Sequence, residues 1–209
     1  MSSCLEIGAG KLRASLVRGT NGAYVVCVDK SYTKESCSHI SDIERFHNQY
    51  ILNPSGDLDA DRILYNNLDI FAFLDAYKYR FHQIHAFRIF EHMFYDSGEI
   101  GRLLAALWSV AANGCDLTIV VPNALSIYDK ILEFENKKTF KLSECERLKL
   151  LINTELQNTR TDPHGSTWTC RLARSYIEAE GTWIVDSIDP DFELEGRDIY
   201  MKIVCFKRI

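Results

Sequence analysis

The sequence predicts an α/β fold in which a doubly wound, mostly parallel sheet of seven strands ends in an antiparallel strand. Strand-like and helix-like segments alternate five times along the 209 residues, as is typical of parallel sheets with right-handed crossovers. The apolar residues of the early strand-like runs are nearly continuous, as in strands covered on both faces. The last two strand-like runs lie too close together for a helical crossover, so the final strand is expected to run antiparallel.

The strand predictions rest on β-branched and apolar runs bounded by turn residues. The clearest are AYVVCVD (23–29) and DLTIVVPN (116–123), the second of which is stopped by Pro122. In chain order, the predicted strands are 4–7, 23–29, 61–67, 83–90, 116–123, 182–188 and 199–206. A turn-rich segment, PDFELEGRD (190–198), is expected to separate the last two strands.

The helix predictions rest on apolar residues spaced three and four positions apart and on residues that end helices. In the clearest case, one helical face carries Ile100, Leu103, Leu104, Leu107, Trp108 and Ala111. Asn113–Gly114 is expected to end that helix, and Gly181 to end another that runs from about Thr167 to Glu180. Further helices are predicted at 11–19, 43–52 and 71–79.

We expect one domain, residues 1–209, with a partly helical insertion at about 124–166. No repeat, low-complexity tract or evident linker divides the chain. Within the insertion, Ser143 and Glu146 have the spacing of a capping box before the run RLKLLINTEL.

Composition narrows the classes of function. A formal net charge of −5 and a pI near 5.7 provide no general attraction for phosphate backbones, so nucleic acid is a less favoured partner. No run approaches the roughly 18 apolar residues that a membrane span needs, and the N-terminus lacks the regions of a signal peptide. The seven cysteines are scattered and never form C-x-x-C, which predicts reduced thiols in a cytoplasmic protein.

A glycine turn follows the first strand. In open parallel sheets, ligands bind beyond the carboxyl ends of the strands near the first strand, and the pattern E-x-G-x-G (Glu6, Gly8, Gly10) lies there. Asp29 closes the second strand about 20 residues later, where an acid can bind a ribose diol. Taken alone, the glycine pattern also fits an ordinary turn, and Asp29 also fits a solvated acid at the end of a strand. Arg13 stands where a dinucleotide fingerprint needs a small residue, so the turn favours a nucleoside without a pyrophosphate.

Taken in order, these motifs resemble those of class I S-adenosylmethionine-dependent methyltransferases, which have a Rossmann-like fold. The resemblance rests on EIGAG (6–10), DK (29–30), NLD (67–69), HAFRIFEH (85–92), the strand DLTIVVPN and the final antiparallel pair. It covers most of residues 3–123 and, by the order of elements, 167–207.

The resemblance implies S-adenosylmethionine as the cofactor. Asp29 would bind its ribose hydroxyls, Asp69 would accept from its adenine amino group, and Ala86 would lie near its methionine amine. The implied cofactor-binding positions are Glu6, Gly8, Gly10, Asp29, Lys30, Leu68, Asp69, Ile70, Ala86 and Phe87.

Two segments are candidates for the acceptor side. His92 follows the fourth strand and is a candidate general base for a hydroxyl acceptor; alternatively, it structures this turn together with Glu91. The loop TDPHGSTW (161–168) is the preferred substrate-facing segment, although Asp162 and Ser166 also suit helix caps. The candidates are therefore His92 and His164 as catalytic residues and Glu91, Asp162 and Trp168 as substrate contacts. No metal is predicted, because His82 and His85 would point to opposite faces of one strand.

The E-H form of the motif at Glu91 and His92 looks most like that of enzymes acting on small molecules, lipid precursors or sugars, so the resemblance favours methyl transfer to a small molecule, a lipid precursor or a sugar or glycan. The chain has no D/N-P-P-Y/F motif after the fourth strand, no P-C motif of cytosine-C5 enzymes and no evident lysine-rich tetrad of ribose methyltransferases. Two alternatives remain open: a catalytically silent, methyltransferase-like binding subunit, and a nucleic-acid or protein methyltransferase with a local basic surface. That surface would comprise Lys137, Lys138, Lys141, Arg147 and Lys149.

The start of the chain departs from the family pattern. Most members of this family carry a helix before the first strand, whereas only residues 1–3 precede CLEI here. The pocket is therefore expected either to be more open or to be covered by segment 124–166, by a second copy of the chain in a homo-oligomer, or by another partner on this N-terminal side.

Overall fold

The computed structural model describes residues 3–8, 24–30, 63–66, 68–78, 80–94, 97–138, 142–147, 166–179, 181–194 and 197–208. The helices expected at 11–19 and 43–52 lie outside these residues, as do three candidate site residues, Gly10, Asp162 and His164.

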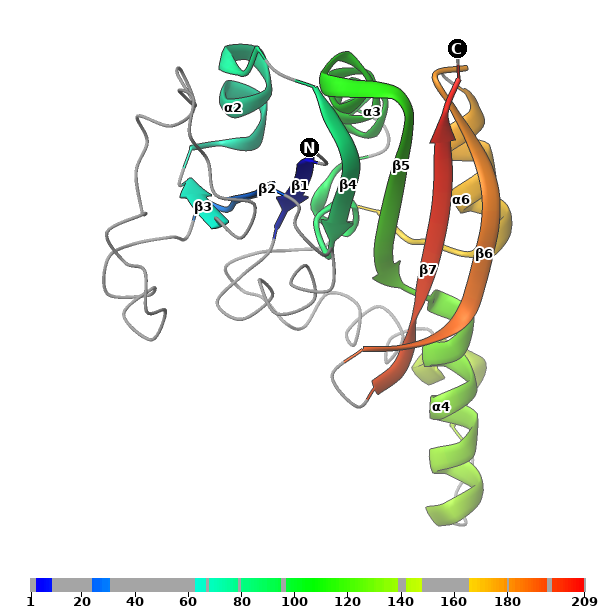
Figure 1. Cartoon of the computed structure of the whole chain (residues 1–209). Coiled ribbons are helices and arrows are strands. Elements are labelled where there is room, and N and C mark those ends of the chain that lie inside the picture. The colour runs from blue at the N-terminus through cyan, green and yellow to red at the C-terminus, as the bar shows by residue number, and fades with distance from the viewer. Residues whose placement is uncertain are drawn as a thin grey trace.

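The described strands form one seven-stranded sheet in the order β3-β2-β1-β4-β5-β7-β6 (Figure 1). Their bounds are β1 Ser3–Ile7, β2 Tyr24–Val28, β3 Ile63–Asn66, β4 Phe81–Phe87, β5 Ala111–Pro122, β6 Trp183–Leu194 and β7 Arg197–Lys207. Strands β1 to β5 pair in parallel, whereas β7 pairs antiparallel with both β5 and β6. The predicted α/β class, with a mostly parallel sheet and an antiparallel last strand, is confirmed.

Helices pack along one face of this sheet and extend from its end (Figure 1). The α-helices are α2 Ile70–Ala76, α3 Glu99–Val110, α4 Ala124–Lys138 and α6 Cys170–Ala179, and a 3-10 helix, η3, spans Phe90–His92. Helices α2, α3 and α6 contribute to the main apolar core, together with the strand residues that face them. Helix α4 follows β5 and projects beyond the carboxyl ends of the parallel strands. None of the described helices is long and apolar enough to cross a membrane.

The junction of α3 and β5 differs from the prediction. Helix α3 ends at Val110, and Ala111 already belongs to β5, so Asn113–Gly114 lies within the strand rather than at the end of the helix. The register explains this: Phe81 pairs with Ala111 and Gln83 with Asp116, so β5 uses five residues where β4 uses two. Gly114, with φ +72°, supplies the left-handed conformation that this irregularity needs.

The C-terminal hairpin is also longer than predicted. Residues expected to form a turn belong to β6, which continues to Leu194 and pairs with β7 through several register shifts. Pro190 is tolerated there because β6 is an edge strand, where a missing N–H can face away from the sheet. Three other boundaries moved by a few residues: β4 begins at Phe81 and ends at Phe87, and α6 begins at Cys170.

Helix α4 starts directly after β5, and Asn123 fixes its N-terminus. Asn123 is buried; its Oδ1 accepts from the Leu125 N–H at 3.2 Å, and its Nδ2 donates to the Pro190 carbonyl at 2.9 Å. The predicted capping box is present: Ser143 N–H donates to Glu146 Oε2 at 2.8 Å, and Glu146 N–H donates to Ser143 Oγ at 3.3 Å.

Candidate functional site

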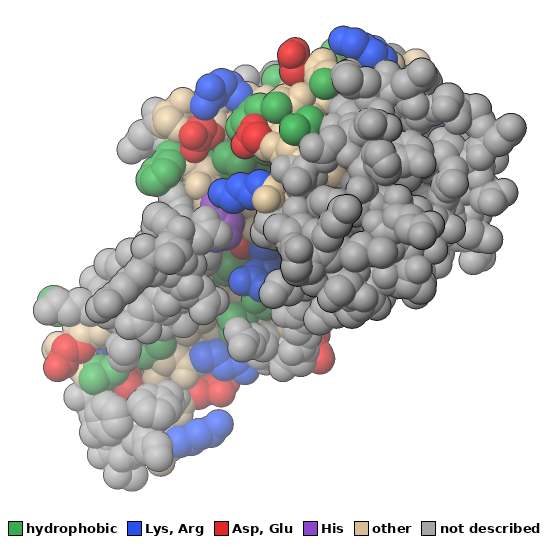
Figure 2. Space-filling model, turned by 90° about the vertical axis from the view of Figure 1, so that its left-hand side faces the viewer, with side chains coloured by type: hydrophobic (Ala, Val, Ile, Leu, Met, Phe, Trp, Pro, Cys, Tyr) green, Lys and Arg blue, Asp and Glu red, His purple; other side chains and the backbone are tan. Residues whose placement is uncertain are grey.

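A cavity of about 480 Å³ opens at the carboxyl ends of β1, β2 and β4, beside the start of α2. Open α/β sheets bind ligands at this edge, where the strand order reverses. Among the sequence-predicted site residues, those that line the cavity are Gly8, Asp29, Lys30, Leu68, Asp69, Ile70 and His92. Figure 2 views the molecule from the side of β3 and shows basic, acidic and histidine side chains exposed along a hollow in this face.

Gly8 packs the end of β1 against the end of β4. A Cβ at this position would lie 2.8 Å from the Phe87 carbonyl oxygen and 3.2 Å from the Ile89 Cβ. The residue also has φ +67°, and its N–H donates to the Val28 carbonyl at 3.0 Å. Only glycine fits this close backbone approach without strain.

Two acids follow the second and third strands. Asp29 is anchored through its backbone, because its N–H donates to the Asn66 carbonyl at 2.9 Å. The buried Asn66 also accepts from the Leu68 N–H through Oδ1 at 2.9 Å, which fixes the chain between β3 and α2. Asp69 is the N-cap of α2, with Oδ1 accepting from the Phe71 N–H at 2.9 Å. The cap engages Oδ1, so Oδ2 is the oxygen with which Asp69 can accept from a ligand.

The opposite wall of the cavity includes His92, which lies on η3. Two bonds from Ser166 fix this 3-10 turn: its N–H donates to the Glu91 carbonyl at 3.1 Å, and its Oγ donates to the Phe90 carbonyl at 3.0 Å. The indole N–H of Trp168 in turn donates to Ser166 Oγ at 2.9 Å. The segment before α6 therefore positions the turn that carries His92.

The expectation that Trp168 faces the substrate is corrected by its placement. This side chain is 1% exposed and packs edge-on against Phe90 and Tyr176, with ring centroids 5.9 Å and 5.1 Å away. Glu91, the other described candidate for a substrate contact, is also 1% exposed and does not line the cavity.

Three of the implied cofactor-binding residues are likewise buried in the sheet. Glu6, Ala86 and Phe87 have exposed fractions of 0%, 0% and 6%, and none lines the cavity. All three lie within β1 or β4, whereas Val28 is the only lining residue that belongs to a described strand. Of these three residues, Phe87 comes nearest to the glycine turn, through its backbone carbonyl.

Sequence reasoning missed the residues that complete the cavity: Val28, Phe71, Arg88, Ile89, Met93, Phe94, Glu99 and Arg102. Arg88 could have been found, because it directly follows a strand that ends at the ligand-binding edge. Val28 ends β2, and Phe71 lies in the first turn of α2. The remaining residues come from the turn after β4 and the first turn of α3, which the structure brings together. Glu99 Oε2 accepts from the Phe94 N–H at 2.8 Å, and Arg102 lies 3.8 Å from Glu99 and over the Phe71 ring.

These residues fit a nucleoside ligand. A carboxylate after β2 can bind a diol, Asp69 can accept from an amino group, and Leu68, Ile70 and Phe71 offer apolar surface for a planar base. Gly8, directly after β1, lines the cavity beside them.

The fold is shared with solved structures of S-adenosylmethionine-dependent methyltransferases. An enzyme of this class from Methanosarcina mazei matches with a TM-score of 0.58 and 12% identity, over 99% of this chain and 92% of its own. The N-methyltransferase NodS from Bradyrhizobium japonicum, solved with S-adenosyl-L-homocysteine, matches with a TM-score of 0.56 and 9% identity, over 100% of this chain and 79% of its own. No family model and no curated protein matches the sequence.

Some of the matched structures are much longer than this chain. The pyocyanin biosynthetic protein PhzM matches with a TM-score of 0.61 and 13% identity, over 99% of this chain but only 50% of its own. A structure from Nostoc punctiforme is covered over 52% of its length. The chain thus spans about half the length of these two proteins.

Proposed function

We propose that this chain is an S-adenosylmethionine-dependent methyltransferase acting on a small molecule, a lipid precursor or a sugar or glycan. The observation that carries the proposal is the cavity in which Gly8, Asp29 and Asp69 converge at the reversal of strand order. Gly8 would lie against the cofactor, Asp29 would bind the ribose hydroxyls, and Asp69 would accept from the adenine amino group.

When bound, S-adenosylmethionine supplies a methyl group already activated on a sulfonium. The protein therefore has to align the acceptor and exclude water, which can lower the barrier by up to roughly 7–11 kcal/mol. His92, on the cavity wall, would accept the proton that a hydroxyl acceptor loses, an effect of about 10²–10⁴-fold in rate. The likeness in fold to the pyocyanin biosynthetic protein supports a small acceptor.

A binding measurement tests whether the chain takes S-adenosylmethionine as its cofactor. Isothermal titration calorimetry of the purified chain with S-adenosylhomocysteine is expected to give a one-to-one complex. Asp29→Asn should weaken binding by about 10- to 100-fold, because it removes the charged acceptor for two hydroxyls. Asp75→Asn is the matched control, since Asp75 is exposed on α2 and does not line this cavity. If the unaltered chain binds neither S-adenosylmethionine nor S-adenosylhomocysteine, the proposal fails.

A measurement of turnover tests whether His92 acts as the general base. Once an acceptor screen has given methyl transfer, His92→Ala should lower kcat by about 10²-fold or more. Its affinity for S-adenosylhomocysteine should match that of the unaltered chain, because the change is made on the acceptor side. Unchanged kcat would contradict a role for His92 as base. A chain that binds the cofactor yet methylates nothing in the screen would instead favour the silent binding subunit.

The basic surface needed for a nucleic-acid methyltransferase is partly neutralised within the described residues. Arg147 Nε lies 2.9 Å from Glu135 Oε2, and Lys137 lies 4.0 Å from Glu133. The first pair is partly buried, because Glu135 is only 5% exposed, whereas the second lies on an exposed helix face. Both pairs leave less charge for a phosphate backbone. We therefore retain the small-molecule or glycan acceptor.

A further inference from the structure

We propose that Arg88 binds a carboxylate at the inner end of the cavity, and that this carboxylate belongs to the amino-acid portion of the methyl donor. The proposal rests on the proposed function and adds the residue that distinguishes the complete cofactor from its nucleoside. The sequence patterns did not single out Arg88 for any role.

Arg88 lies beside the glycine turn and lines the cavity. With the base near Leu68 and Ile70 and the ribose at Asp29, the rest of the cofactor points toward Gly8 and the end of β4. Gly8 packs against residues 87–89, so Arg88 directly adjoins the glycine turn, and it lines the same cavity. A cation at this end of the cavity complements the carboxylate of a bound amino acid.

The backbone of Arg88 has an unusual conformation. Arg88 has φ +52°, the only positive value at a non-glycine residue in the part of the chain that the structure describes. Its N–H donates to the Val120 carbonyl at 2.8 Å, so pairing with β5 holds this conformation. Left-handed backbone at a residue other than Gly or Asn is unfavourable and concentrates at functional sites. An arginine here indicates that the side chain itself is needed.

The guanidinium of Arg88 is oriented by its neighbours and still has donors for a ligand. Glu91, which is buried, lies 4.0 Å from Arg88 Nε, and the Tyr200 ring centroid lies 6.0 Å from the guanidinium carbon. These contacts orient the group, but neither is a hydrogen bond. Among the described residues, no acceptor is assigned to its five N–H donors, and the side chain is 32% exposed. Arginine binds carboxylates in a bidentate fashion with donors arranged in this way.

The other basic residues of the cavity are placed differently. Arg102 comes from α3, where Glu99 and the Phe71 ring hold it, and Lys30 directly follows Asp29 after β2. Both belong to the end of the cavity that would receive the nucleoside. Arg102 is therefore a matched control: it is a cavity arginine with an acidic and an aromatic neighbour, but at the wrong end.

Two ligands that differ by the amino-acid portion test the proposal. S-adenosylhomocysteine carries the carboxylate, whereas 5′-methylthioadenosine has the same nucleoside without it. The affinity of each is measured by calorimetry for the unaltered chain and for Arg88→Gln, Arg88→Lys and Arg102→Gln. Arg88→Gln should lose about 10- to 100-fold in affinity for S-adenosylhomocysteine and keep its affinity for methylthioadenosine. Arg88→Lys should recover part of the loss, and Arg102→Gln should leave the ratio of the two affinities unchanged.

The outcomes separate this inference from the proposed function. If neither ligand binds the unaltered chain, the proposed function fails and the inference fails with it. If both ligands bind but Arg88→Gln leaves the ratio of the two affinities unchanged, only the inference about Arg88 is overturned. That result is also expected if Arg88 binds an anionic acceptor in place of the carboxylate of the methyl donor. An equal loss for both ligands would indicate a structural effect and would also overturn it. The retained affinity for methylthioadenosine shows that the variant is folded.

Discussion

His85 is a partly buried imidazole on β4, paired in register with Glu6 on β1 and Thr118 on β5. Burial, together with the charge of Lys202, lowers the pKa of His85 from its ordinary value of 6.5 to about 4. Between these two pH values the unfolded chain binds a proton that the folded chain does not. Because the unfolded state binds more protons, the free energy of unfolding falls as the pH falls through this range.

We expect the free energy of unfolding to drop by on the order of 1–3 kcal/mol between pH 7 and pH 4 through His85. Urea denaturation at several pH values measures this, and His85→Gln should flatten the profile. His82→Gln, an exposed position on the same strand, should leave the slope unchanged. A stability that rises as the pH falls through 6.5 would contradict the prediction and would mean that Glu6 holds the imidazole charged.

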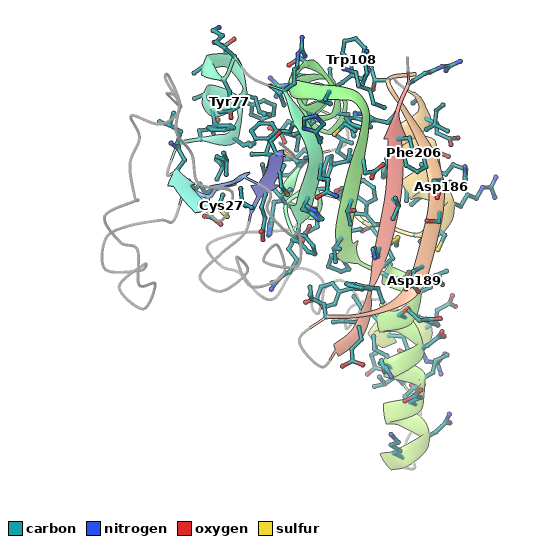
Figure 3. The ribbon with its side chains drawn as sticks, in the orientation of Figure 1. Cys27, Tyr77, Trp108, Asp186, Asp189 and Phe206 are labelled. Atoms are coloured by element: carbon teal, nitrogen blue, oxygen red, sulfur yellow. The ribbon has the colours of Figure 1, made fainter. Side chains whose placement is uncertain are left out.

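Trp183 joins two elements that are distant in the sequence. Its side chain is 1% exposed, and its indole N–H donates to the Leu104 carbonyl at 3.0 Å, linking β6 to α3. Trp108 is also bonded to a carbonyl, that of Arg208 at 3.3 Å, but it is 38% exposed and lies near the C-terminal end of β7 (Figure 3). The two tryptophans therefore differ mainly in burial.

Trp183→Phe should lower the free energy of unfolding by about 2–4 kcal/mol, because it leaves a cavity and removes a buried hydrogen bond. Trp108→Phe should cost less than about 1 kcal/mol. Urea denaturation followed by circular dichroism measures both variants without relying on tryptophan fluorescence. Equal losses in the two variants would show that the contact between β6 and α3 contributes nothing specific to stability.

At the level of elements, the sequence predicted which segments are strands better than where they end. Apolar runs such as those of β2 and β5 are readable because both faces are buried, and that burial requires continuous hydrophobicity. The Asn113–Gly114 pair was misread as the end of a helix because a strand irregularity needs the same left-handed residue as a turn. The acidic residues and the proline of β6 are typical of a turn. Only the pairing of β6 with β7 shows that they belong to an edge strand.

For the whole molecule, the lengths of the connections predicted that most strands run parallel and that the last strand runs antiparallel. The parallel strands in turn predicted which edge of the sheet binds ligands. Gly8, Asp29 and Asp69 were therefore predictable as neighbours. The inward residues Glu6, Ala86 and Trp168 were not, because a motif gives position along the chain and not the direction of a side chain. Arg102 meets the cavity only because the start of α3 packs near the end of β4, which no local pattern encodes.

The exposed edge of the sheet has a consequence for how the protein behaves at high concentration. Strand β6 runs for 12 residues at that edge, and a long free edge can recruit a strand from another molecule. Along β6, however, Asp186, Asp189, Pro190, Asp191 and Glu193 are exposed, and the first two are labelled in Figure 3. A second copy aligned there would bring like charges together and meet a position without a donor. Self-association through this edge is thus opposed by the residues that obscured the strand in the sequence.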